Sequence, residues 1–75
     1  MLNGDLSNRL AKALATRLKT EANTPAKQID LAYRLATSRL PTPSEKQTAL
    51  TFLRTQPLEE FALAILNLNA FIYVN

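Results

Sequence analysis

Leucines recur at every fourth position near the start of the chain, a spacing that predicts an amphipathic helix. The apolar stripe that they form consists of Leu6, Leu10, Leu14 and Leu18. Polar side chains occupy the opposite face of the same segment: Asn8, Arg9, Lys12, Thr16 and Lys19. Asp5 is a suitable N-cap, because its carboxylate accepts hydrogen bonds from the first backbone amides of a helix. We therefore predict a first helix from Asp5 or Leu6 to about Thr20.

A second helix is predicted from the pair Thr24-Pro25 to about Arg39, since a capping residue followed by proline is a typical helix start. Its apolar positions share one face: Ile29, Ala32, Tyr33, Ala36 and Leu40. Leu31 and Leu35 widen this face to more than half of the circumference. A helix that is apolar over so wide an arc buries itself against two neighbours. We therefore place it at the centre of the fold.

The segment Leu40 to Glu45 combines a helix stop with a helix start. Pro41 disfavours helical geometry at Leu40 and removes a backbone donor, so the second helix ends there. Thr42 then precedes Pro43, and Glu45 stands three residues after Thr42. This is the spacing of a capping box with proline at the first helical position. It predicts a third helix from Pro43 to about Thr55, with its apolar positions inward: Ala49, Leu50, Phe52 and Leu53.

The last third of the chain is the most apolar. We predict a fourth helix from about Leu58 to Leu68, whose polar strip is little more than Glu59, Glu60 and Asn67. The segment 70–74 is rich in β-prone residues but too short and solitary to build a sheet, so it is predicted to be an extended tail. The predicted fold is all-α: a single domain over residues 1–75, a compact four-helix bundle with an extended C-terminal tail.

Composition restricts the chemistry that this chain can perform. It has no Cys and no His, which removes a cysteine nucleophile, the commonest general base and the commonest zinc ligand. We expect no catalytic residues, no metal site, no cofactor and no enzymatic activity. The start of the chain lacks the charged and apolar regions of a signal peptide. No run of about 18 apolar residues is present, so no membrane span is predicted.

Three segments together resemble a known family. They are residues 1–18, with Met1-Leu2-Asn3-Gly4 and the run from Ala11 to Leu18; residues 33–45, from Tyr33 through the proline corner to Glu45; and residues 64–74, from Ala64 to Val74. Their order and spacing over nearly the whole chain resemble the C-terminal end of the planctomycete-specific domain one. That domain of unknown function occurs in large planctomycete proteins, often beside a cytochrome c-type module. One departure is Ala70, where the family often has Glu before the aromatic residue.

The resemblance implies that the chain is the C-terminal fragment of a larger protein, exported or attached to the cell envelope. It brings no established activity and no catalytic residues. We therefore predict a non-catalytic helical packing or protein-interaction module, whose partner is the remainder of the parent protein or another protein. The predicted interface gathers the outward apolar residues of the last helix and tail: Leu63, Leu68, Phe71, Ile72 and Tyr73.

An alternative prediction is a small helix-turn-helix DNA-binding domain formed by the second helix, the corner and the third helix. Its reading residues are the polar ones on the outer face of the third helix: Lys46, Gln47, Thr51 and Arg54. Against it, two cations on that helix are few, because phosphate contacts dominate DNA affinity. The net charge of +3 is only mildly basic, so nucleic acid is the less favoured partner.

Overall fold

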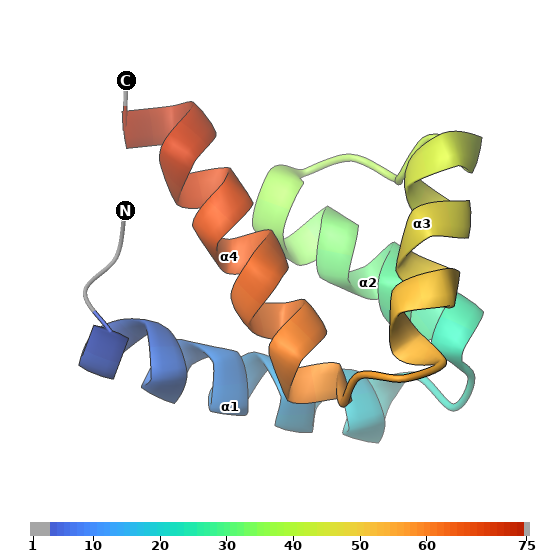
Figure 1. Cartoon of the computed structure of the whole chain (residues 1–75), viewed down its shortest axis with the longest axis horizontal. Coiled ribbons are helices and arrows are strands. Elements are labelled where there is room, and N and C mark those ends of the chain that lie inside the picture. The colour runs from blue at the N-terminus through green and yellow to red at the C-terminus, as the bar shows by residue number, and fades with distance from the viewer. Residues whose placement is uncertain (1–3, 75) are drawn as a thin grey trace.

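The computed structural model describes the backbone of residues 4–74 and the side chains of residues 4–68. Four helices follow one another: α1 (Gly4–Glu21), α2 (Pro25–Thr37), α3 (Pro43–Leu53) and α4 (Leu58–Val74). Figure 1 shows α4 running diagonally across α1, with α2 behind it and α3 at the side. The predicted all-α class and the four helices are confirmed. α2 contacts each of the other three helices, as its wide apolar face predicted, but α4 does so too, so the two helices share the centre of the fold.

The larger of two core clusters joins all four helices around α2. Its buried members are Leu18, Ile29, Ala32, Tyr33, Ala49, Phe61 and Ile65. Leu18 and Ile29 are the largest fully buried side chains. The other three inward residues predicted for α3 are half-buried, and they pack against this cluster: Leu50, Phe52 and Leu53. Burial of such apolar side chains is the main favourable contribution to folding.

The second core cluster lies between α1 and α4, which make the most extensive contact of any helix pair. Its buried members are three alanines, Ala11, Ala15 and Ala62. Larger side chains pack around them and are only partly buried: Leu14, Leu58, Leu63 and Leu66. Small side chains at a crossing point let two helices approach closely, because the distance between their axes depends on the residues in contact. The α1–α4 contact therefore depends on alanine rather than on leucine.

This packing corrects the predicted orientation of the first helix. The residues of α1 that face inward are Ser7, Ala11, Ala15 and Leu18. Leu6 is 36% exposed and Leu10 is 40% exposed, although the leucine stripe predicted that both would be buried. Positions 7, 11 and 15 lie about 100° around the helix from positions 6, 10 and 14. The close approach of α4 turns this alanine face toward the core and leaves Leu6 and Leu10 at its side, whereas Leu18 stays buried.

The two predicted threonine caps are confirmed. Oγ1 of Thr24 accepts a hydrogen bond from the backbone amide of Lys27 at 3.2 Å, and Oγ1 of Thr42 accepts one from the amide of Glu45 at 3.1 Å. Other boundaries differ. Asp5 lies within α1 rather than before it, and α2 ends at Thr37 because Ser38 adopts a left-handed conformation with φ of 63°. The amide of Ser38 donates to the carbonyl of Arg34 at 3.1 Å, which closes the last turn.

The predicted extended tail is wrong, because α4 continues as a helix to Val74. Extending a formed helix adds a backbone hydrogen bond for each residue ordered. The propensity cost of aromatic or β-branched residues in a helix is only a few tenths of a kcal/mol each. Local β-preference was therefore too weak to end the helix at Leu68. The side chains of Phe71, Ile72 and Tyr73 lie outside the described part of the structure.

The alanine contact predicts a large difference between two neighbouring substitutions in α4. Ala62 is fully buried, whereas Ala64 is exposed on the same helix. Ala62→Leu places a larger side chain in a closed contact and should lower the free energy of unfolding by about 1–3 kcal/mol. Ala64→Leu should change it by less than about 0.5 kcal/mol. Urea denaturation of both variants measures this difference; equal effects would show that α1 and α4 are not in close contact at Ala62.

Candidate interaction surface

Five large apolar side chains of the described residues are exposed to solvent, and all are leucines. They are Leu6, Leu10, Leu35, Leu40 and Leu68. Single exposed leucines are normal on a protein surface, so only their grouping carries meaning. Two of the five, Leu10 on α1 and Leu35 on α2, line the same depression. That depression is the strongest candidate for a binding surface.

The depression is an open groove of about 320 Å³ between α1, α2 and α4. We call it the leucine groove. Its lining is Leu10, Ala13, Leu14 and Arg17 from α1, Leu35 and Ala36 from α2, and Leu66 from α4. Leu14, Ala36 and Leu66 are half-buried, so they form its floor while Leu10 and Leu35 reach solvent. A concave apolar surface with few polar groups is typical of ligand or peptide sites.

Arg17 is the charged residue in this lining. Its Nε donates to Oε2 of Glu21, four residues on, at 2.6 Å. The side chains of this pair are 54% and 46% exposed. An ion pair so accessible to water contributes only about 0–1 kcal/mol. The Arg17 guanidinium is therefore held loosely enough to pair with another carboxylate at the groove.

The predicted interface residues lie on α4, and the structure separates them. Leu68 is 45% exposed. It follows Ile65 by three residues, so it extends the face of α4 that is buried earlier in the helix. Leu63 is half-buried and packs against the alanine contact with α1. Of the predicted set, Leu68 is thus the residue whose described side chain is open to a partner; Phe71, Ile72 and Tyr73 have no described side chains.

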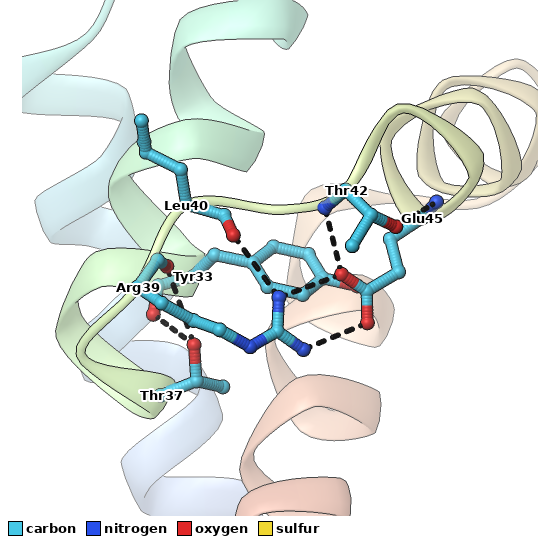
Figure 2. Close-up of polar contacts among 6 residues, drawn as sticks. All are labelled: Tyr33, Thr37, Arg39, Leu40, Thr42 and Glu45. Atoms are coloured by element: carbon cyan, nitrogen blue, oxygen red, sulfur yellow. Dashed lines mark hydrogen bonds and ion pairs between the residues drawn. The ribbon is translucent and has the colours of Figure 1, made fainter.

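The proline corner holds the densest polar network of the described residues (Figure 2). Arg39 and Glu45 form a bidentate ion pair, with Nη1 to Oε1 at 2.7 Å and Nη2 to Oε2 at 2.9 Å. Oε1 of Glu45 also accepts a hydrogen bond from the amide of Thr42 at 2.8 Å. The hydrogen bond from Arg39, followed by that from Thr42, lowers the pKa of Glu45 to about 2. This carboxylate therefore completes the predicted capping box and ties it to the residues that follow α2.

Tyr33 and Thr37 support the corner from α2. The guanidinium of Arg39 lies 5.7 Å from the centre of the Tyr33 ring, within the range of a cation–π interaction. Burial raises the pKa of the Tyr33 hydroxyl. The hydroxyl of Thr37 donates to the carbonyl oxygen of Tyr33 at 2.6 Å. Tyr33 is 7% exposed, so its ring belongs to the core and connects the more exposed Arg39–Glu45 pair to it.

The residues of the helix-turn-helix alternative are only partly available. Gln47, Thr51 and Arg54 line a shallow depression at the side of α3. Nζ of Lys46 instead contacts both carboxylate oxygens of Asp30 on α2, at 2.9 and 3.0 Å. One of the two cations on the predicted reading face is thus neutralised by a fixed partner. This contact weakens the alternative, because DNA affinity depends on cations that reach phosphate.

Acidic residues that could bind a metal are spread apart in the part of the chain that the structure describes. No three acidic side chains gather there as metal ligands. Glu59 and Glu60 are exposed in the first turn of α4, where carboxylates favour the positive end of the helix. Over the same described residues, no helix has the length and apolar character needed to cross a membrane.

Comparison with known protein families, with curated proteins and with solved structures gives no match.

The leucine groove was not predicted from the sequence, because it forms only where three helices pack together. The one local signal was the spacing of Ser7, Ala11 and Ala15, which repeats every four residues beside the leucine stripe. Such a row of small residues competes with the leucines for the buried face. It is the row that faces the core.

The lowered pKa of Glu45 predicts a stability change that depends on pH. The carboxyl has an ordinary pKa of 4.5 when unfolded and about 2 when folded, so its contribution is complete above about pH 5 and is lost as the pH falls toward 2. Glu45→Gln keeps a cap acceptor but loses the ion pair. It should cost about 1 kcal/mol at pH 7 and progressively less in acid.

Glu59→Gln is the matched control for this prediction, since it removes an acidic side chain from the first turn of α4, where no arginine pair is formed among the described residues. Chemical denaturation of both variants between about pH 2 and pH 7 measures the effect. A constant difference between Glu45→Gln and the unsubstituted chain at every pH would show that the Arg39 pair contributes nothing.

Proposed function

We propose that this chain is a non-catalytic helical module that packs against another protein surface, at the C-terminus of a larger protein. The observation that carries the proposal is the exposure of three leucines on a compact helical fold. Leu10 and Leu35 open into the leucine groove, and Leu68 extends the buried face of α4 beyond its cover. Grouped apolar surface of this kind often marks a site of interaction with another protein or a ligand.

The chemistry of the chain supports a binding role over a reaction. Without His and Cys, an enzyme would depend on carboxylates, hydroxyls and amines. Four of the six carboxylates are in ion pairs with neighbouring cations: Asp5, Glu21, Asp30 and Glu45. The other two, Glu59 and Glu60, are adjacent on α4 and so point about 100° apart. They do not flank a common substrate bond.

The resemblance to the C-terminal end of the planctomycete-specific domain one remains part of this proposal. It supplies the larger parent protein and an exported or envelope location. The resemblance rests on the residues that the structure places in the alanine contact, including Ala11 and Ala15, and in the corner from Tyr33 to Glu45. These are residues that maintain the fold, as expected of a packing module without a reaction centre.

Photo-crosslinking in the native cell tests this function. Benzoylphenylalanine replaces Leu10 in one variant and Leu68 in another; Lys12, exposed on the same helix as Leu10, is replaced as the control. We expect crosslinks from Leu10 or Leu68 to one defined protein segment, in the same or another polypeptide, and none from Lys12. Variants that melt like the unsubstituted chain but crosslink to no protein at either leucine would contradict the interaction role.

A further inference from the structure

The third helix buries less of its surface than the other helices do over the described residues. In α3 only Ala49 is buried, whereas α1 buries four residues and α2 buries three. Leu50 and Leu53 are half-buried, and they line the depression of about 400 Å³ at the side of α3. Within the described part of the chain, α3 contacts α2 and α4 and lies apart from α1 (Figure 1). Its apolar attachment to the bundle is therefore the weakest of the four.

Two ion pairs add to this attachment. Arg39 and Glu45 connect the residues after α2 to the first turn of α3, at 2.7 Å. Lys46 connects α3 to Asp30 of α2, at 2.9 Å. The four side chains are between 30% and 50% exposed. Ion pairs this accessible to water are weak, so they can break without the loss of the remaining fold.

The segments on either side of α3 are also accessible to solvent. Before α3, residues 38–40 are exposed and begin with the left-handed Ser38; after α3, residues 54–57 are all exposed. Neither segment supplies a member of the two core clusters. Both segments can therefore change their backbone conformation while the helices that they join stay in place.

The other three helices keep a core of their own without α3. Each of α1, α2 and α4 contacts the other two. Leu18 and Ile29, the largest fully buried side chains, belong to α1 and α2. The second core cluster has all its buried members on α1 and α4. Departure of α3 removes Ala49 from the larger cluster and leaves its other buried members in contact.

We propose that α3 opens as a separate unit: it leaves the bundle and unfolds while α1, α2 and α4 stay packed. The two ion pairs stabilise the closed state, and opening uncovers the side of α2 that α3 covers. A detached helix of 11 residues is too short to persist in water, so its amides become open to solvent. Such partial opening is a separate process from global unfolding. The inference is independent of the proposed function, because it concerns α3 rather than the exposed leucines.

Amide hydrogen exchange of the whole chain, followed by NMR in low concentrations of urea, tests the proposal. Relative to free-peptide rates, we expect residues 47–53 to exchange at least about tenfold faster than the buried Ala15, Leu18 and Ile65. The exchange of residues 47–53 should also depend less steeply on urea, because opening of α3 exposes less surface than global unfolding does.

Two glycine substitutions at exposed positions distinguish opening from global unfolding. Ala64→Gly weakens α4, which is helical in both the closed and the open state. It should speed the exchange of Ala15 and Leu18 about fivefold and leave residues 47–53 unchanged. Gln47→Gly weakens α3 and so destabilises the closed state relative to both the open and the unfolded states. It should speed exchange about threefold in α3 and in α1 alike.

A second pair of variants tests the role of the ion pairs. Glu45→Gln keeps a cap acceptor but removes the pair with Arg39, and it should speed the exchange of residues 47–53 about fivefold. Arg17→Gln is the matched control, because it removes the pair with Glu21 inside α1. That pair is present in both the closed and the open state, so the exchange of α3 should not change.

Three results would overturn the proposal. Equal protection of α3 and α1, with the same dependence on urea, would show that the four helices unfold only together. Faster exchange of residues 47–53 in Ala64→Gly, by the same factor as Ala15, would show the same. Unchanged exchange of α3 in Glu45→Gln would show that the Arg39 pair does not stabilise the closed state.

Discussion

The close contact between α1 and α4 determines which side chains this small protein buries and which it presents. Ala11, Ala15 and Ala62 occupy the contact and are buried, so a larger side chain there would have to displace its neighbours. Because the alanine face of α1 meets α4, the neighbouring leucines turn toward the side of the bundle. Leu18 still reaches the main core, but Leu10 does not. The leucine groove is thus a direct consequence of how tightly the two helices approach.

The third helix that lines this groove is α2, and the corner after α2 helps to hold it in place. α2 reaches it with Leu35 and Ala36, just before the chain reverses at Ser38. The corner that follows is held by the ion pair between Arg39 and Glu45 and by the cap at Thr42 (Figure 2). Lys46 and Asp30 add a second connection between α2 and α3. The corner therefore positions α3 on α2, while α4 and α1 enclose the other side of α2.

Features that depend on a few neighbouring residues could be predicted from the sequence. The caps at Thr24 and Thr42 are of this kind, because their hydrogen bonds span three residues. The inward face of α1 could not be predicted in the same way. Both the row with Leu10 and the row with Ala11 have helical spacing, and the choice between them depends on α4, nearly fifty positions further along the chain. The end of α4 was missed because residue type near Val74 suggested a strand, whereas the helix before it was already formed.

The exposed leucines of the candidate surface could likewise be predicted only in part. Leu68 was correctly predicted to stay partly exposed, since α4 is apolar over more of its circumference than its neighbours cover. Exposure of Leu10 and Leu35 follows from the packing of three helices. The row of small residues at Ser7, Ala11 and Ala15 is the local pattern that bears on it, and it concerns α1 alone. Leu40, predicted to lie on the buried face of α2, is 52% exposed because α2 ends three residues earlier.

Methyl NMR with a soluble paramagnetic gadolinium chelate tests the central claim most directly, because the chelate broadens signals from side chains that solvent reaches. The account predicts strong broadening of the Leu10 and Leu35 methyl signals and protected signals from Leu18, Ala15 and Ala62. Leu10 and Leu35 methyl groups as protected as those of Leu18 would contradict it, because the leucine face of α1 would then be the buried one.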